Sequence, residues 1–280
     1  MNISITQKNH HIRDERIQFF EEGHQYLIDG KKGYQSVTTM ISKLFEPFDA
    51  VAISEKVFHN SRDSRTSKYK NMQSPEEIQN AWHQTSVLGT QLHYQIECFY
   101  NQELPSDVEV NHASLLKQYE ETTTKHNSNV EWNHFIQFVK NYPDKIPYRS
   151  EWTVFNEDIN VCGSIDMLFK NPEDDTYSIY DWKRTEMLSP MMNNYDKYAI
   201  LPVLCHIPDT KYWHYAIQLN MYKYILETKY DKVVRDLALV KLHPSGDNYE
   251  IQLIPDLKED ILDLVDMLVE DNKTKEYIIE

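Results

Sequence analysis

The sequence contains few cysteines and no long apolar run. Its three cysteines, Cys98, Cys162 and Cys205, are too few and too scattered for a disulfide framework, and no Cys-x-x-Cys pair suggests zinc. No run of about 18 apolar residues occurs, which argues against a membrane span. The N-terminal residues lack both the apolar core of a signal peptide and the Arg-rich pattern of a transit peptide. We therefore expect an intracellular protein, in the cytoplasm, the nucleus or a viral factory, with no membrane partner.

Basic charge is also scarce. The chain has 29 Lys and Arg against 44 Asp and Glu, a net charge of -15, although nucleic-acid binding usually depends on neutralising phosphates. The charge is unevenly distributed, because residues 56–70 hold five basic residues and one acid, whereas residues 256–280 hold nine acids and three lysines. The basic segment (residues 56–70) is therefore a candidate nucleic-acid contact, through Arg62, Arg65, Lys68 and Lys70.

Three short runs in the second half of the chain predict a β-meander. They are rich in β-branched and aromatic residues, and clusters of Asn, Asp, Glu and Pro separate them. The runs cover residues 151–155, 161–169 and 177–183. The pattern predicts three strands that are sequential neighbours in one sheet.

This predicted meander carries two acids and a lysine that together suggest metal chemistry. Side chains alternate along a strand, so Asp181 and Lys183 share one face while Trp182 turns into the core. Asp166 lies on the neighbouring strand, where Gly163 permits the bulge or close backbone approach that would aim it. The two carboxylates could then share a cation.

Hard divalent cations such as Mg²⁺ prefer oxygen ligands at about 2.0–2.1 Å, so two carboxylates and a backbone carbonyl make a sufficient site. Such a metal supplies Lewis acidity. Lys183 would orient the attacking water and offset charge on the phosphorus. A solvated surface ion pair between Asp181 and Lys183 is an equally good explanation of this motif by itself.

Two predicted helices carry further polar residues at helical spacing. His93 and Glu97 share one helix face, and Gly89, one turn earlier, would let that helix approach a sheet. His93 is a candidate metal ligand that would favour Mn²⁺ without excluding Mg²⁺, or else a structural histidine. Gln218 and Tyr222 share a face of a later helix, which either lines a nucleic-acid path or is simply solvated.

In this order the motifs resemble the PD-(D/E)XK nuclease superfamily, in particular its RecB-like branch, which includes mitochondrial genome maintenance exonucleases and members from phages and large DNA viruses. The resemblance covers about residues 86–226. Gly89–His93 is similar to the branch's Gly-x-x-x-His helix, Glu151 to its first-strand acid and Gly163–Asp166 to its Gly-x-x-Asp. Asp181–Lys183, with Arg184 and Thr185, is similar to its Asp-Tyr-Lys-Thr, and Gln218–Tyr222 to its Gln-x-x-x-Tyr.

The resemblance implies a role for each matched residue. The implied metal ligands are His93, Asp166, Asp181 and the backbone carbonyl of Trp182. Lys183 is the implied catalytic lysine, and Glu151 is a supporting catalytic acid. The implied substrate contacts are Gln218, Tyr222, Arg184 and Thr185.

The same resemblance implies a Mg²⁺- or Mn²⁺-dependent DNase that holds one or two ions. It would act on single-stranded DNA or DNA ends, in replication, recombination or repair. Some relatives carry an iron-sulfur cluster on four cysteines, which three cysteines cannot build. Two alternatives remain: an RNA endonuclease of the cap-snatching type, and an inactive nuclease that serves as a nucleic-acid-binding subunit.

The chain is expected to form a single α/β domain over residues 1–280, with a restriction-endonuclease-like core of a mixed sheet flanked by helices. An N-terminal hairpin and helices occupy residues 1–148, the sheet core residues 149–255, and a C-terminal helix residues 256–280. We expect hairpins at 17–28 and 235–254, and helices over 75–93, 107–124 and 129–142.

An inserted arm at residues 186–213 separates the lysine strand from the later helix. Long ordered loops are often lids or binding loops. Its rings, Tyr195, Tyr198, Tyr212 and Trp213, suggest a lid that stacks unpaired bases. The alternative is a hydrophobic flap over the sheet edge.

Overall fold

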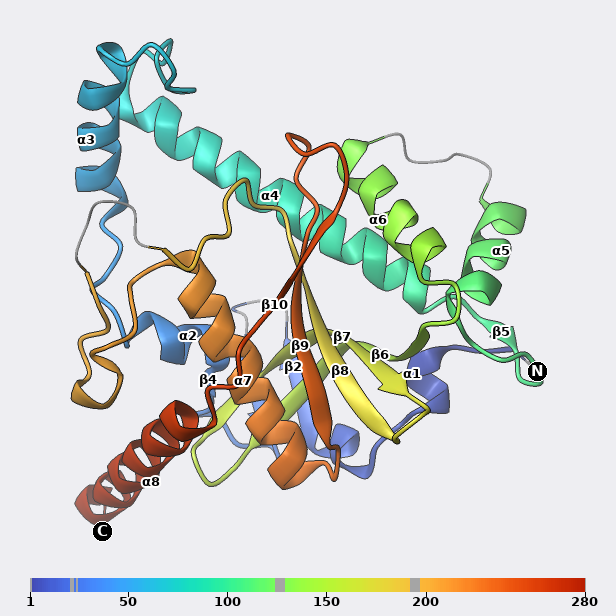
Figure 1. The fold of residues 1–280 in the computed structure, drawn as a ribbon. Helices are drawn as coiled ribbons and strands as arrows, with labels where there is room; N and C mark the ends of the chain where they lie inside the picture. The colour runs from blue at the N-terminus through green and yellow to red at the C-terminus, as the bar shows by residue number, and fades with distance from the viewer. Residues whose placement is uncertain (1, 21–22, 24, 124–128, 192–196, 280) are drawn as a thin grey trace.

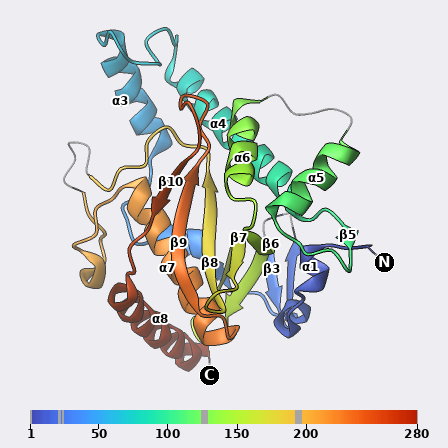
Figure 2. The same cartoon turned by 45° about the vertical axis from the view of Figure 1, so that its right-hand side comes forward.

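A mixed sheet of six strands lies between two layers of helices (Figure 1; Figure 2). The computed structural model describes residues 2–20, 23, 25–123, 129–191 and 197–279, and for residues 274–279 it describes the backbone alone. None of the helices in these ranges is long and apolar enough to cross a membrane. In chain order the elements are β1 (Asn2–Ile3), α1 (Ile5–Lys8), η1 (Ile12–Arg16), β2 (Ile17–Phe20), β3 (Gln25–Ile28), β4 (Gln35–Ser36), α2 (Val37–Ser42), α3 (Ala50–Arg62), α4 (Pro75–Tyr100), β5 (Leu104–Pro105), α5 (His112–Thr122), α6 (Val130–Asn141), β6 (Ile146–Asn156), β7 (Val161–Asn171), β8 (Thr176–Lys183), η2 (Pro202–Leu204), α7 (Lys211–Lys229), β9 (Val234–Lys241), β10 (Glu250–Leu253) and α8 (Lys258–Ile279).

The sheet has the strand order β10-β9-β8-β7-β4, and β6 pairs with β7. The pairs β6–β7 and β7–β8 are antiparallel, which confirms the predicted meander. The chain returns through α7 to place β9 parallel to β8, and the predicted hairpin of β9 and β10 is also present. The mixed α/β class is therefore confirmed. The predicted N-terminal hairpin, β2 and β3, forms a separate two-stranded sheet.

Two hydrophobic cores hold the helices against opposite faces of the sheet. One core joins the sheet to α2, α7 and α8, and includes Ile179 and Leu239. The other joins it to α4, α5 and α6, and includes Phe169 and Trp182. Because alternate side chains of a strand enter opposite cores, each strand is fixed from both sides. Trp182 is fully buried, as its place in the strand predicts.

Helix α4 is the longest described element and lies on the same side of the sheet as α5 and α6 (Figure 1). It begins at Pro75, where the side chain of Ser74 accepts the Glu77 N–H, a favourable helix start. In its last turns, one face is buried in the core on the sheet, through Leu92, Ile96, Phe99 and Tyr100. The helix predicted over residues 75–93 is therefore present and longer than expected, and it carries His93 to the sheet.

The predicted helix at 107–124 is shorter than expected, because Asn111 caps it and helix α5 begins at His112. The side chain of Asn111 accepts the Ser114 N–H, which satisfies one of the free donors of the first turn. The residues before it, 107–110, are not helical. Thr124, at the end of the expected range, lies outside the described residues.

In its described residues, the arm at 186–213 packs partly into the protein. Its residues Ala199, Leu204, Ile207 and Tyr212 belong to the core beneath α2, α7 and α8. Tyr212 is buried and has no face on which a base could stack. Tyr195 falls outside the described residues. For the described part of the arm, the hydrophobic flap is therefore the better description, and base stacking on Tyr212 is wrong.

Two glycines of the motifs have different neighbours from those expected. A Cβ at Gly89 would meet nothing within 4 Å, so this glycine faces open space and does not bring α4 closer to the sheet. A Cβ at Gly163 would lie 2.7 Å from the Tyr222 hydroxyl. Gly163 therefore admits the tyrosine ring from α7, and the β6–β7 ladder shows no register shift at that glycine.

These surroundings predict opposite effects of the same substitution. Gly89→Ala should raise the free energy of unfolding by about 0.5–1 kcal/mol, because alanine loses less backbone freedom than glycine when the helix forms. Gly163→Ala should lower it by about 1–3 kcal/mol, because the methyl group collides with Tyr222. Urea unfolding of the two variants measures both effects. A stable Gly163→Ala protein would contradict the close packing of Tyr222 on this strand.

Candidate metal centre

The site lies where strands β7 and β8 separate. Their last paired residues are Met167 and Tyr180, and the next residues in the same register are Asp166 and Asp181. The carboxylate of Asp166 accepts the backbone N–H of Trp182 at 2.9 Å, in place of a strand-to-strand hydrogen bond. β8 meanwhile stays paired with β9 as far as Lys183. The two acids therefore face the opening between the strands.

A third acid, Glu151 on β6, lies at the same level of the sheet. The pairs Ser150–Met167 and Trp152–Ile165 flank it, so its register position is opposite Asp166. Glu151 has a φ of 46°, the left-handed region that costs a side-chain-bearing residue about 1–3 kcal/mol. The hydroxyl of Ser164 donates to its carboxylate at 2.9 Å. Register and local backbone together align three acids across β6, β7 and β8.

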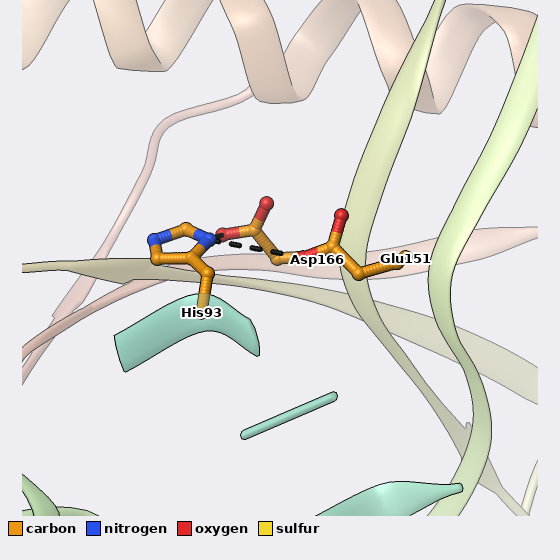
Figure 3. A group of neighbouring side chains, drawn as sticks. All are labelled: His93, Glu151 and Asp166. Atoms are coloured by element: carbon orange, nitrogen blue, oxygen red, sulfur yellow. Dashed lines mark ion pairs between the residues drawn. The ribbon is translucent and has the colours of Figure 1, made fainter. Parts of the chain in front are cut away.

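His93 reaches this row of acids from helix α4 (Figure 3). Its Nδ1 is 3.4 Å from a carboxylate oxygen of Asp166 and 3.7 Å from one of Glu151. Its Nε2 is 2.8 Å from the backbone carbonyl oxygen of Trp182. One ligand atom from each of His93, Glu151 and Asp166 lies within 4.8 Å of the others. Atoms bound to a common dication at about 2.0–2.2 Å are at most about 4.4 Å apart, so small inward movements would suffice.

Asp181 is adjacent to this group of three but is not part of it. It forms an ion pair with Lys183, and both side chains are largely buried. The ammonium of Lys183 lies 4.4 Å from the ring centroid of Tyr215 on α7. The described group of three thus contains Glu151, the expected supporting acid, in the place expected for Asp181. Asp181 is instead paired with Lys183.

Burial and mutual repulsion perturb the ionisation of the acids. Burial, joined by the charge of Asp166, raises the pKa of Asp181 to about 6, although Lys183 opposes the shift. Burial also raises the pKa of Asp166, with a contribution from Glu151. The carboxyl groups of Asp166 and Asp181 therefore resist ionisation. A bound dication would favour the charged form of each acid.

The neighbouring acids also raise the pKa of the two basic groups, against the effect of burial. Burial alone would lower the pKa of His93, but the charge of Asp166 and a hydrogen bond to Glu151 raise it to about 9. Burial by itself would also lower the pKa of Lys183, but the charges of Asp181 and Asp166 outweigh this effect and raise the pKa above its usual value. Lys183 is therefore held as an ammonium group.

Gln218 and Tyr222 lie behind the carboxylates. Their side chains are only 8% and 3% exposed, and they come from the α7 face that meets the sheet. Burial raises the pKa of Tyr222, a hydrogen bond with Gln218 opposes this, and the charges of Asp166 and Asp181 add to it. Neither residue lines the groove described below, as a substrate contact would.

Arg184 and Thr185 follow the lysine on the same strand end. Arg184 forms an ion pair with Glu131 at 2.7 Å, so its charge is already compensated. The Thr185 hydroxyl donates to the carbonyl of Met187 at 3.3 Å. Of these two expected substrate contacts, Arg184 lines the groove beside the site.

A groove of about 670 Å³ connects the site with the first half of α4. One wall is the α4 face that runs from Trp82 past Gly89 to Glu97, and Lys211 and Tyr215 of α7 contribute to the other. The expectations from sequence missed Tyr215. It lies one turn before Gln218 and Leu219, and its helical spacing is the one signal that points to it.

The basic segment lies near the far end of this groove. The indole N–H of Trp82 donates to the hydroxyl of Tyr69 at 3.0 Å. Lys68 forms an exposed ion pair with Glu186, just beyond the lysine strand, and the guanidinium of Arg62 stacks on Phe58. The segment is therefore adjacent to the groove without reaching the carboxylates.

The chain matches no protein-family model and shows no significant similarity to a curated protein. The interpretation of the site depends on its own geometry.

The carboxylates around His93 predict an unusual titration. In metal-free protein the imidazole should titrate near pH 9 rather than 6.5, and Asp166→Asn should lower this pKa. Because the pKa is raised by folding, the protonated ring stabilises the protein fully below about pH 6.5, and this contribution is lost as the pH rises through about 9.

Proton NMR of the histidines measures this directly, with His93→Gln identifying the signal. His112 is an internal control, because burial lowers its pKa to about 3. A pKa of His93 at or below 6.5 would show that the acids do not surround the ring.

Proposed function

We propose that this protein is a Mg²⁺- or Mn²⁺-dependent DNA nuclease of the PD-(D/E)XK type, with a restriction-endonuclease-like core. The observation that carries the proposal is the convergence of His93, Glu151 and Asp166 within 4.8 Å, beside the buried ion pair of Asp181 and Lys183. A solvated surface pair would not be buried or adjacent to two further acids and an imidazole.

The donor set fits a hard or borderline divalent ion. It offers two carboxylates and Nδ1 of the His93 imidazole, while the Trp182 carbonyl oxygen holds the ring from the other side, 2.8 Å from Nε2. Carboxylate oxygen with imidazole nitrogen suits Mg²⁺ and Mn²⁺. Asp181 is adjacent and would join the ligands if its pair with Lys183 opened. When bound, the ion would polarise the phosphate and lower the pKa of its water.

Lys183 supplies the positive charge that such a reaction needs from the protein. Asp181 and Asp166 keep its ammonium charged, and the Tyr215 ring limits its movement. A fixed cation beside the phosphate stabilises the extra negative charge that develops during hydrolysis, commonly the largest single contribution to catalysis. Lys183 also lies in the wall of the groove, where it can orient an attacking water.

Cleavage assays test the proposal. The protein is incubated with end-labelled single-stranded DNA, duplex DNA or RNA, in Mg²⁺, Mn²⁺ or chelator. We expect metal-dependent cutting of single-stranded DNA. Lys183→Ala should reduce the rate by about 10²–10³-fold or more while Mn²⁺ binding, followed by calorimetry, persists. Asp166→Asn should weaken both.

Lys117→Ala is the matched control, because this exposed lysine lies on α5, away from the groove. Unimpaired cutting by Lys183→Ala would contradict the assignment. Cutting of RNA alone would favour the RNA endonuclease. Metal binding without cutting of any substrate would favour an inactive binding subunit.

A further inference from the structure

We propose that a single strand of nucleic acid lies along α4, with its bases on the aromatic rings of Phe48, Trp82 and Tyr94 and its phosphates on the basic segment. This inference rests on the proposed function for the identity of the substrate. It adds where the strand lies, which groups hold it and how many nucleotides they contact.

The first observation is the position of the exposed rings. Phe48 and Tyr94 are 68% and 66% exposed, the highest values for large aromatic side chains in the described part of the chain. Tyr94 lines the groove, and Phe48 packs edge-on against Trp82, which lines it too, with 5.8 Å between the ring centroids. Unpaired bases stack on such rings whatever their sequence, whereas paired bases are not accessible to them.

The second observation is the arrangement of charge. Arg65 and Lys70 form no ion pair within the described ranges, and Lys68 has only its exposed pair with Glu186, a kind of contact worth little. At the opposite end of the groove lie Glu97 and Glu151. The basic segment adjoins the groove at Trp82, whose indole N–H donates to Tyr69, whereas the two acids lie beside the metal centre. Lys183, Arg184 and Lys211 also line the groove. A polyanion is therefore attracted to the half between Trp82 and the metal centre.

The length of α4 sets the size of this contact. Trp82 and His93 are 11 positions apart on one helix, or about 16 Å at about 1.5 Å per residue. A stacked strand advances about 3.4 Å per nucleotide, so about five nucleotides span the distance. Gly89 lies between them and leaves the groove open, because a Cβ there would meet nothing within 4 Å.

Binding of labelled oligonucleotides tests the path independently of cleavage. The measurement uses the Lys183→Ala protein, so that the oligonucleotide is not cleaved. Fluorescence anisotropy with oligo(dT) of two to ten nucleotides then gives the affinity. We expect affinity to rise steeply up to about five nucleotides and only slightly beyond. Phe48→Ala should weaken binding of the longer oligonucleotides by about 5- to 100-fold, the usual effect of losing one stacked base.

The cationic contacts have a separate signature. Arg65→Ala with Lys70→Ala should reduce the slope of log affinity against log salt by about 1.4, because each phosphate contact contributes about 0.7 for single strands. Tyr198→Ala removes an exposed ring from the arm, and Lys117→Ala an exposed cation from α5. Both controls should bind like the parent protein.

The possible results separate this path from the proposed function. Unchanged binding by Phe48→Ala and the double variant would overturn the path, even if the protein cuts DNA. Equal competition by polyglutamate or duplex DNA would also overturn it. If the variants lose affinity as expected but the parent protein cleaves no substrate, the binding path is supported and the nuclease proposal is contradicted. Oligo(U) beside oligo(dT) distinguishes RNA from DNA.

Discussion

The separation of β7 from β8 beyond Met167 and Tyr180 is the constraint on which the site depends. An antiparallel ladder that continued would bring Asp166 and Asp181 together as a pair with no room for a ligand. Here the carboxylate of Asp166 replaces the next ladder acceptor by binding the Trp182 N–H, so the strands can part without leaving that buried donor unsatisfied. The ring of Tyr222 enters beside Gly163, next to the opening.

The acids in this opening are held at an electrostatic cost. Three carboxylates share a poorly solvated space with one ammonium and one imidazole, and burial raises the pKa of Asp166 and Asp181. Such an arrangement is stable because Lys183 and His93 compensate part of the charge. In addition, the Trp182 N–H donates a hydrogen bond to Asp166, and the Ser164 hydroxyl donates one to Glu151. The remaining negative charge is what attracts a divalent cation. Structural stability and metal affinity therefore depend on the same few contacts.

The two cores decide where this charge is accessible. α7 packs on one face and contributes Tyr215 beside Lys183, while α4 packs on the other and contributes His93. Because the first half of α4 extends beyond the sheet towards α3, its polar and aromatic face remains open as a groove (Figure 1). Several described residues of the arm that follows β8 join the core, and the groove is lined by α4, by the start of α7 and by the end of β8.

Local patterns in the sequence determined the meander, the α4 helix, the hairpin of β9 and β10, and the shared face of Asp181 and Lys183, because alternation and capping act over neighbouring residues. They also placed Trp182 in a core. Only tertiary structure decided that Glu151 joins His93 and Asp166, that Gln218 and Tyr222 lie behind the acids, and that Gly89 faces open space. Register between strands and the approach of helices set those distances, through residues far apart in the chain. A left-handed residue within β6 follows from no propensity of glutamate, since its conformation is imposed by the strands around it.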